Sequence, residues 1–285
     1  MKKIPPKVAA VHDLACFGRC SLAVIMPVLS AMGVQVCPLP TAVFSTHLGG
    51  FTQVVCHDFA DRMTAFFQHW QREGLAFDCL YSGFLASEAQ FAATEAFLTA
   101  FRINQPLVLV DPVMGDHGRL YSSYTETLCQ LMRGLVRQAD VITPNYTEAC
   151  ILLGETYQET EPEVARLQAW CRRLSDMGPR QVVITGVPAG DALLNIGYDR
   201  RLEQDILVSK PQVAARYPGT GDLFASALLG RLLQDDTFAR AIETAAEFVS
   251  AAVAQTFAAG TPPREGVLFE TVLAHLIGNG EDENK

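Results

Sequence analysis

The sequence predicts an α/β protein of three layers, in which a mostly parallel sheet lies between helices on both of its faces. Short β-branched runs alternate along the chain with longer segments of helical period, an order that favours parallel strands joined by crossover helices. The run 107–111 is almost wholly apolar, as expected of a strand covered on both faces. No Pro/Ser-rich linker or internal repeat divides residues 1–285, so we expect a single domain whose acidic end, about 280–285, is frayed.

The first half of the chain supplies most of the expected parallel strands. Apolar or β-branched runs predict strands over 7–12, 34–39, 79–82, 107–111 and 141–143. Apolar residues at helical spacing predict helices over 20–32, 58–73, 88–101, 125–138 and 146–153.

The second half begins in the same way and then changes. A helix over 163–176 and a strand over 182–185 continue the alternation. Two strand-like runs between 192 and 208 flank Asp199-Arg200-Arg201, which predicts an antiparallel hairpin. After Pro218 the pattern is helical almost to the end, over 223–233, 238–256 and 267–277.

Composition excludes several classes of protein. A net charge of −9 gives no global support for binding DNA or RNA, so we expect no nucleic-acid partner. The eight cysteines are scattered through apolar stretches, which favours reduced thiols in the cytoplasm over a disulfide framework. The start at 1–7 is basic but lacks the apolar core of a signal peptide. The longest apolar stretch, 21–36, is interrupted by Pro27 and Gly33, so we expect no membrane span.

The strongest local signal is Pro218-Gly219-Thr220-Gly221-Asp222, which runs directly into an apolar helix. Two glycines allow a tight turn whose N–H groups point outward at a helix N-terminus, where the helix dipole favours an anion. Asp222 in the first turn could accept the proton of a hydroxyl that attacks a bound phosphate. An N-capping aspartate on an ordinary turn is the alternative interpretation.

Two further acidic segments follow consecutive strands, where open α/β sheets bind their ligands. Asp111 ends one strand with Asp116 on the following turn, and Asn145 and Glu148 follow the next strand. Asn145 and Glu148 would share one face of a helix, and with Asp111 they form an oxygen-rich patch suited to hydrated Mg²⁺. Ordinary turn chemistry at Asp111 and a capping box at Asn145 and Glu148 are the structural alternatives. The polar stretch 116–124 suits a mobile flap over the phosphates or an exposed loop.

On these residues the chain resembles the ribokinase-like superfamily and, within it, the vitamin B6 kinases. The resemblance covers nearly the whole length. Gly-Thr-Gly-Asp is shared across the superfamily, whereas the segments 44–47 and 81–85 look specific to the B6 branch. The matching pieces are Phe44-Ser45-Thr46-His47, Tyr81-Ser82-Gly83-Phe84-Leu85, Asp111-Pro112-Val113-Met114-Gly115-Asp116, Thr143-Pro144-Asn145-Tyr146-Thr147-Glu148, Val183-Ile184-Thr185-Gly186 and Gly219-Thr220-Gly221-Asp222.

The resemblance implies transfer of the ATP γ-phosphoryl group to the 5′-hydroxymethyl of pyridoxal, pyridoxamine or pyridoxine. Asp222 would be the catalytic base, and Gly219, Thr220 and Gly221 would form the anion hole. Mg-ATP would be held by Asp111, Asp116, Asn145 and Glu148, with Asp111 and Glu148 as metal ligands and Thr185 near the phosphates. His47, Phe84 and Asp13 would hold the pyridine ring beside Asp222.

The substrate half departs from the family pattern. Many B6 kinases carry a small hydroxyl residue where this chain has Asp13, and a threonine where it has Leu48. Asp13 would pair with a protonated ring nitrogen or a 3-hydroxyl. A turn role for Asp13 and a buried structural role for His47 are the alternatives, so the preferred vitamer stays open.

Two other functions remain open. A hydroxymethylpyrimidine kinase of thiamine synthesis would use the same catalytic half, and a non-catalytic binder of pyridoxal phosphate would need no base. The resemblance also implies a homodimer and activation by a monovalent cation such as K⁺.

Overall fold

The computed structural model describes residues 4–277. Its centre is a nine-stranded sheet in the order β11-β10-β9-β8-β5-β4-β1-β2-β3. The six strands from β9 to β2 run parallel, and antiparallel strands flank them at both edges. The strands are β1 Lys7–Ala15, β2 Gln35–Phe44, β3 Cys56–Asp58, β4 Cys79–Ser82, β5 Leu107–Val110, β8 Val141–Ile142, β9 Gln181–Ala189, β10 Ala192–Asp199 and β11 Gln204–Pro211.

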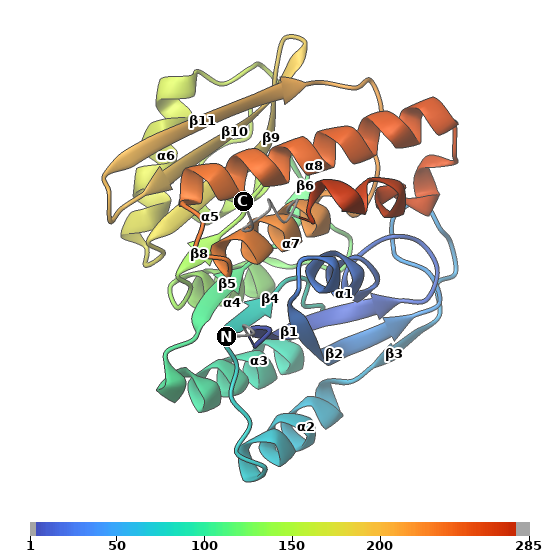
Figure 1. Ribbon diagram of the computed structural model, residues 1–285, viewed down its shortest axis with the longest axis vertical. Coiled ribbons are helices and arrows are strands. Elements are labelled where there is room, and N and C mark those ends of the chain that lie inside the picture. The colour runs from blue at the N-terminus through green and yellow to red at the C-terminus, as the bar shows by residue number, and fades with distance from the viewer. Residues whose placement is uncertain (1–3, 278–285) are drawn as a thin grey trace, which may run out of the picture.

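Helices cover both faces of the sheet, so the predicted three-layer fold class is confirmed (Figure 1). The first face packs against α2, α3, α4, α5 and α6 around a cluster that includes Phe91 and Phe97. The other face packs against α1, α7 and α8 around Ile25 and Phe248. The helices are α1 Leu22–Ala31, α2 Ala60–Arg72, α3 Glu88–Phe101, α4 Glu126–Val136, α5 Tyr146–Leu153, α6 Val164–Asp176, α7 Thr220–Leu232 and α8 Phe238–Ala259, with 3-10 turns at Arg102–Asn104, Pro263–Glu265 and Phe269–His275.

Most predicted elements are present, and the hairpin around Asp199 is β10 paired with β11. The predicted helix over 267–277 is present as a shorter 3-10 helix, Phe269–His275. The edge strand β3 was not predicted, and it is only three residues long. Within 116–124, part of the stretch expected to be a flap joins a two-stranded ribbon of β6 (Gly115–Asp116) and β7 (Arg119–Leu120). The predicted frayed segment 280–285 lies outside the described residues.

The strand order reverses at β1, which lies between β4 and β2. Doubly wound sheets open a crevice at the carboxyl ends of the strands beside such a reversal. Val11 of β1 pairs with Ser82 of β4, so Asp13 and Phe84 both lie just beyond the last paired position of the two strands. The topology therefore gathers the β1–α1 and β4–α3 loops at one edge of the sheet.

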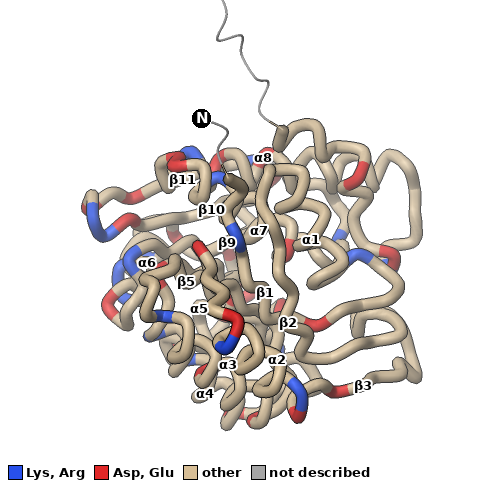
Figure 2. Tube along the Cα trace, turned by 60° about the horizontal axis from the view of Figure 1, so that its bottom comes forward, with Lys and Arg blue, Asp and Glu red and all other residues tan. Residues whose placement is uncertain are grey.

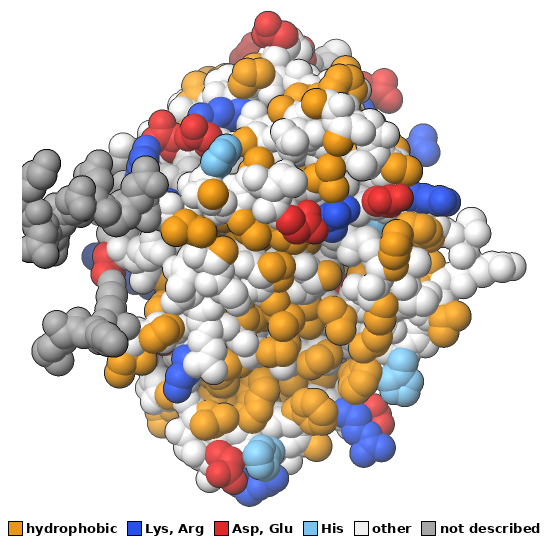
Figure 3. Space-filling view, turned by 45° about the vertical axis from the view of Figure 1, so that its right-hand side comes forward, with side chains coloured by type: hydrophobic (Ala, Val, Ile, Leu, Met, Phe, Trp, Pro, Cys, Tyr) orange, Lys and Arg blue, Asp and Glu red, His pale blue; other side chains and the backbone are white. Residues whose placement is uncertain are grey.

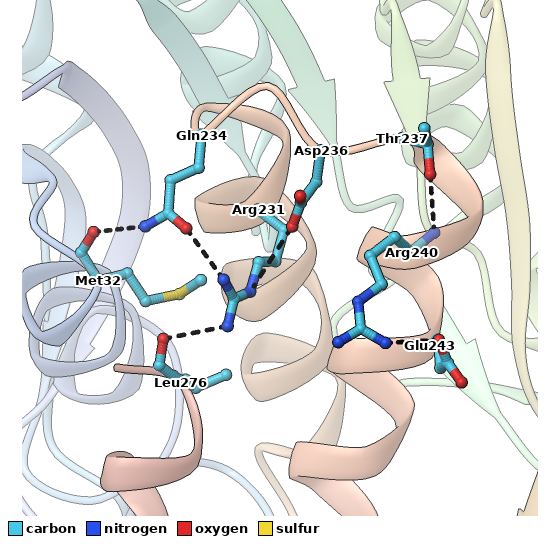
Figure 4. Close-up of polar contacts among 8 residues, drawn as sticks. All are labelled: Met32, Arg231, Gln234, Asp236, Thr237, Arg240, Glu243 and Leu276. Atoms are coloured by element: carbon cyan, nitrogen blue, oxygen red, sulfur yellow. Dashed lines mark hydrogen bonds and ion pairs between the residues drawn. The ribbon is translucent and has the colours of Figure 1, made fainter. Parts of the chain in front are cut away.

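Polar contacts fix the C-terminal end of α7 (Figure 4). The Arg231 guanidinium donates to the Leu276 carbonyl at 3.3 Å and to Gln234 Oε1 at 3.1 Å. Gln234 in turn donates to the Met32 carbonyl, at the end of α1, at 2.9 Å. Because a helix is a stiff rod, these contacts help to hold its N-terminal end, which carries the Gly-Thr-Gly-Asp segment.

Basic residues of the described chain lie among acidic ones. Figure 2 shows Lys and Arg interspersed with Asp and Glu, notably around α6 and the β10–β11 hairpin. Within the described part of the chain, no helix combines the length and apolarity needed to cross a bilayer.

Candidate active site

The Gly-Thr-Gly-Asp segment forms the start of α7, and no side chain caps this helix. Gly219 has φ 84°, and a Cβ at this position would lie 2.0 Å from the Arg19 carbonyl oxygen. Only glycine therefore fits, both for its backbone angle and for its close approach to the β1–α1 loop. Gly221 is exposed and Thr220 is partly exposed, so the N-terminal N–H groups of α7 are accessible to an anion.

Asp222 lies in the first turn of α7 and is partly buried. Its Oδ2 accepts a hydrogen bond from the Ser21 backbone N–H at 2.8 Å. Burial raises the pKa of Asp222 to about 7; the Ser21 N–H opposes this shift, while the negative charges of Asp111 and Asp13 add to it. A carboxyl group with a pKa close to neutral is suited to accept a proton during a reaction at that pH.

Asp13 is joined to Asp222 through Ser21. The Ser21 hydroxyl donates to Asp13 Oδ1 at 2.8 Å, while the Ser21 backbone N–H bonds Asp222. Burial raises the pKa of Asp13 to about 6, against the opposing effect of the Ser21 hydrogen bond. Thr41 and Ala42 form a β-bulge opposite Asp13, between the pairs His12–Pro40 and Leu14–Val43.

Asp111 is buried at the end of β5 and faces the same helix start. Its Oδ1 accepts a hydrogen bond from the Thr143 hydroxyl at 2.9 Å. Its Oδ2 would lie 3.8 Å from a Cβ at Gly221. Burial raises the pKa of Asp111, and the Thr143 hydrogen bond opposes that shift.

Asn145 and Glu148 form the capping box that was one of the two predicted interpretations. The Asn145 side chain accepts from the Glu148 N–H at 2.9 Å, and Glu148 Oε2 accepts from the Asn145 N–H at 2.8 Å. Glu148 Oε1 also accepts from the Met114 N–H at 3.1 Å. Thr185 lies beside this box, because a parallel bridge pairs it with Asn145.

The local charge suits a divalent cation. Burial and the nearby Asp111 carboxylate both raise the pKa of Glu148 well above its usual value. Among residues 4–277, no group of three His, Cys, Asp or Glu side chains is arranged as a complete metal site. Two buried carboxylates near the accessible start of α7 fit Mg²⁺, which is usually bound through one or two carboxylates, water and substrate phosphates. They do not form an all-protein cage.

The ribbon β6–β7 holds Asp116 at the edge of this site. Asp116 is exposed, and its carboxylate lies 3.2 Å from His117 Nε2. The ribbon is fastened to α5, since Asn145 Nδ2 donates to the Gly115 carbonyl and the Gly118 N–H donates to the Thr147 hydroxyl, both at 2.9 Å. The backbone of this part of the predicted flap is therefore tied to the core.

Phe84 and His47 border the crevice from two loops. Phe84 is half-buried, and its ring centroid lies 6.0 Å from that of Tyr124. His47 Nε2 is 2.7 Å from the Arg264 carbonyl, and Nδ1 accepts from the Gly49 N–H at 3.0 Å. Both ring nitrogens of His47 are thus engaged with backbone, so only its ring edges and faces are left to meet a ligand.

Three residues of this site were not predicted from the sequence. Tyr121 follows β7, and its pKa is raised first by burial and then by the negative charges of Glu148, Asp116, Asp111 and Asp222. Thr143 bonds Asp111, and Ser21 bonds Asp13 and Asp222. Thr143 could have been found from its place at the end of an apolar strand. Nothing local marks Ser21 or Tyr121.

Comparison with known proteins gives consistent results. Residues 28–265 match the phosphomethylpyrimidine kinase family. A Bacteroides thetaiotaomicron protein, described as a candidate phosphomethylpyrimidine kinase and solved in one form with pyridoxal, is 40% identical over 96% of each chain, with a TM-score of 0.91. Pyridoxal kinase from Lactobacillus plantarum is 32% identical over 95% of this chain and 96% of its own, with a TM-score of 0.86. A pyridoxine/pyridoxal/pyridoxamine kinase of Bordetella avium is 31% identical over 87% of this chain and 85% of its own. The expected ribokinase-like fold is confirmed.

Proposed function

Because the chain belongs to the phosphomethylpyrimidine kinase family, we propose that it transfers the γ-phosphoryl group of ATP to the 5′-hydroxymethyl of a vitamin B6 vitamer, as an enzyme of B6 salvage. The observation that carries this proposal is the position of Asp222, a carboxyl with a pKa of about 7 in the uncapped first turn of α7. A base and an anion-binding helix start are thereby combined within one turn. A coupled ADP-release assay with Mg-ATP and each of pyridoxal, pyridoxamine and pyridoxine tests it.

Phosphoryl transfer depends mainly on positioning and on charge neutralisation, and different residues of the chain supply each of these. Asp222 accepts the proton of the substrate hydroxymethyl group at its carboxylate. The backbone N–H groups of Gly219, Thr220 and Gly221 donate to the transferring phosphoryl oxygens, and the dipole of α7 adds to this stabilisation. Tyr121 and Asp116 border the phosphates from the β6–β7 side.

Mg²⁺ bound with ATP would neutralise charge on the phosphates. Asp111 and Glu148 would hold it, since both are buried acids whose pKa values are raised and which therefore favour a nearby cation. Asn145 would support it indirectly by fixing Glu148, and Thr185, in the middle of β9 and bridged to Asn145, would face the phosphates. A monovalent cation such as K⁺ is a further expectation, tested by replacing K⁺ with Na⁺ in the assay.

The B6 ring would lie between Asp13 and Phe84, at the carboxyl ends of β1 and β4. The Asp13 carboxylate would bind a protonated ring nitrogen or a 3-hydroxyl, and the Phe84 ring would cover one face of the pyridine. His47 would contribute an apolar ring edge and hold the neighbouring loop through its two backbone contacts.

Phosphorylation of hydroxymethylpyrimidine is the second candidate, and the name of the matched family favours it. Turnover of hydroxymethylpyrimidine and of no B6 vitamer would select this reaction and leave the roles of Asp222 and the anion hole unchanged. No ADP release with any of the three B6 vitamers or with hydroxymethylpyrimidine, together with binding of pyridoxal phosphate, would favour a non-catalytic binder. We favour the B6 reaction because the relative of 40% identity was solved with pyridoxal.

We further propose that the protein is cytoplasmic and forms a homodimer. Several large apolar side chains are exposed on or beside α1, β2 and β3, including Phe17, Leu48 and Val55, which are 51%, 48% and 71% exposed. Figure 3 shows hydrophobic side chains gathered on the side of the molecule that carries these elements. Light scattering should give twice the chain mass, and Val55→Glu should reduce it to the monomer. Leu202→Glu, at an exposed apolar residue in the β10–β11 turn, is the control and should leave the dimer intact.

A further inference from the structure

Ser21 uses every polar group it has, and two of them reach the two acids of the substrate crevice. Its N–H donates to Asp222 Oδ2 and its hydroxyl donates to Asp13 Oδ1, each at 2.8 Å. Its carbonyl accepts from the Val24 and Ile25 N–H groups, at 2.9 Å each, and so begins α1. Ser21 is only 8% exposed, so these contacts are shielded from water.

The backbone of Ser21 is held in an unusual conformation. Its φ is 53° and its ψ is −134°, a region that residues other than glycine rarely adopt. Ser21 also precedes α1 at the N-cap position, yet its side chain makes no capping hydrogen bond there. The hydroxyl that would ordinarily cap the helix is directed to Asp13 instead. Such conformations persist where surrounding contacts fix them, and they are frequent at functional sites.

The adjacent residue, Cys20, is subject to the negative charges of both acids. The pKa of the Cys20 thiol is raised by burial and then by the negative charges of Asp222 and Asp13. Within residues 4–277, neither acid is paired with a basic side chain. In the described part of the chain, the crevice therefore presents two linked carboxyl groups with no basic side chain paired to either.

We propose that Ser21 is a positioning residue that couples substrate recognition at Asp13 to proton acceptance at Asp222, and that it keeps Asp13 ionised to select substrates whose ring presents a cation, such as a pyridinium. This inference rests on the proposed kinase function. The hydroxyl stabilises the charged form of Asp13, and the N–H stabilises the charged form of Asp222. A cation bound at Asp13 would also offset the repulsion that Asp222 experiences from it.

Other titratable groups near Asp13 and Asp222 could also change charge in a pH experiment. The charge of Asp13 or Asp222 raises the pKa of two kinds of neighbour, thiols and phenols: Cys20, Cys56, Tyr81 and Tyr121. These thiols and phenols therefore stay protonated between pH 5 and 8. Asp111 also titrates near neutrality and acts on Asp222. Asp13 itself, with a pKa of about 6, is the group that the Ser21 hydroxyl controls directly.

Ser21→Ala is the informative variant, because it removes the hydroxyl and keeps the backbone N–H that binds Asp222. Loss of a hydrogen bond to a charged group should raise the pKa of Asp13 from about 6 to about 7. The variant's KM for pyridoxamine, relative to the unmodified enzyme, should then increase about fivefold at pH 6 and about twofold at pH 7. At pH 8 the KM values of the variant and of the unmodified enzyme should agree. At each pH, kcat of the variant should lie within about twofold of kcat of the unmodified enzyme.

Further variants separate this role from a purely structural one. Ser21→Gly also removes the hydroxyl but relieves the positive φ, so it should reproduce the same pH-dependent KM even if Ser21→Ala folds poorly. Ser87→Ala removes the N-cap of α3, away from the crevice, and should leave KM unchanged at every pH. Adding Ser21→Ala to Asp13→Asn should raise KM no further than Asp13→Asn alone.

A KM ratio that is constant from pH 6 to 8, or additive effects in the double variant, would overturn the proposal. A carbon NMR titration of the labelled aspartates provides a test that does not require turnover. The Asp13 signal is assigned as the one that disappears in Asp13→Asn. If the unmodified protein phosphorylates no B6 vitamer, the proposed function fails. The NMR titration then decides the coupling alone, and an unchanged Asp13 pKa in Ser21→Ala would disprove it.

Discussion

Oδ2 of Asp111 faces Gly221, where an added Cβ would lie only 3.8 Å from this oxygen. A buried acid at the end of β5 and the exposed start of α7 are thereby brought together, although 110 residues separate them in sequence (221 minus 111). Asp111 and the N-terminal turn of α7 therefore border the same part of the crevice.

Replacing Asp111 by Asn should stabilise the metal-free protein above neutral pH. The pKa of Asp111 is raised in the folded state, so ionisation opposes folding, and stability is lost as the pH rises toward and through that folded pKa. We expect a gain of roughly 1 kcal/mol or more at pH 8, or about 2 °C in Tm, and no gain at pH 4. Thermal melts in EDTA measure this. Asp116→Asn, at an exposed acid, should show no such gain, and a variant less stable than the native protein at pH 8 would contradict the prediction.

The same substitution should weaken the response to the nucleotide. Removing one of two buried carboxylates lowers the attraction for Mg²⁺, so the Tm increase produced by Mg-ADP should shrink. The measurement is a melt with and without Mg-ADP at fixed concentrations. An undiminished increase would mean that the cation does not bind at Asp111.

Asp222→Asn should lower kcat by about 10²–10⁴-fold, because an amide cannot accept the hydroxyl proton. ADP affinity, measured by calorimetry, should change little, since the backbone N–H groups of α7 are retained. Asp191→Asn, in the exposed β9–β10 turn, is the control. Near-normal turnover would reject Asp222 as the base.

Activity should rise with pH through about 7 and then level off. The pKa of Asp222 is raised to about 7, so its carboxylate, the form that accepts a proton, accumulates above that pH. A profile of kcat/KM from pH 5 to 9 measures this, with the same substrate throughout. A profile that stays flat from pH 5 to 8 would exclude the titration of Asp222 from the rate.

Gly219→Ala should disrupt the anion loop. A Cβ there would lie 2.0 Å from the Arg19 carbonyl, so the loop must shift, and kcat should fall about 10²-fold or more. Gly74→Ala is the matched control, since Gly74 has φ 66° but nothing lies within 4 Å of its added Cβ. The control has the same kind of backbone strain without a clash. Equal activity in the two variants would contradict the role assigned to the close approach of Gly219 to Arg19.

Arg231→Ala should lower stability and change kcat little. Arg231 joins the C-terminal end of α7 to the Leu276 carbonyl and to Gln234. The exposed Arg240 side chain bonds Glu243, which belongs to its own helix (Figure 4). We expect a loss of about 1–2 kcal/mol for Arg231→Ala and within about 0.5 kcal/mol for Arg240→Ala. Chemical denaturation measures both, and equal losses would contradict the role assigned to Arg231.

Local sequence patterns determined the elements that are long and regular. The helices over 88–101 and 146–153 have the predicted bounds, because apolar spacing and N-terminal capping residues are local signals. Apolar spacing over 267–277 predicts a helix but not its type, and the segment forms a 3-10 helix over Phe269–His275 that contacts α8 and α1. The short strands β3 and β6–β7 depend on pairing with distant or adjacent backbone, which no local periodicity encodes.

Glycine conformation, helix periodicity and strand apolarity act over a few residues, so the fold class, the glycine turn before α7 and the acids at the strand ends could be predicted from the sequence. Which of these groups meet depends on contacts between distant parts of the folded chain. Ser21 and Asp222 are 201 positions apart yet hydrogen-bonded, and the two ring nitrogens of His47 are bound by backbone, one of them from Arg264. Such contacts depend on what the folded chain places around each group. The same holds for the pKa values of Asp13, Asp111 and Asp222, which burial raises.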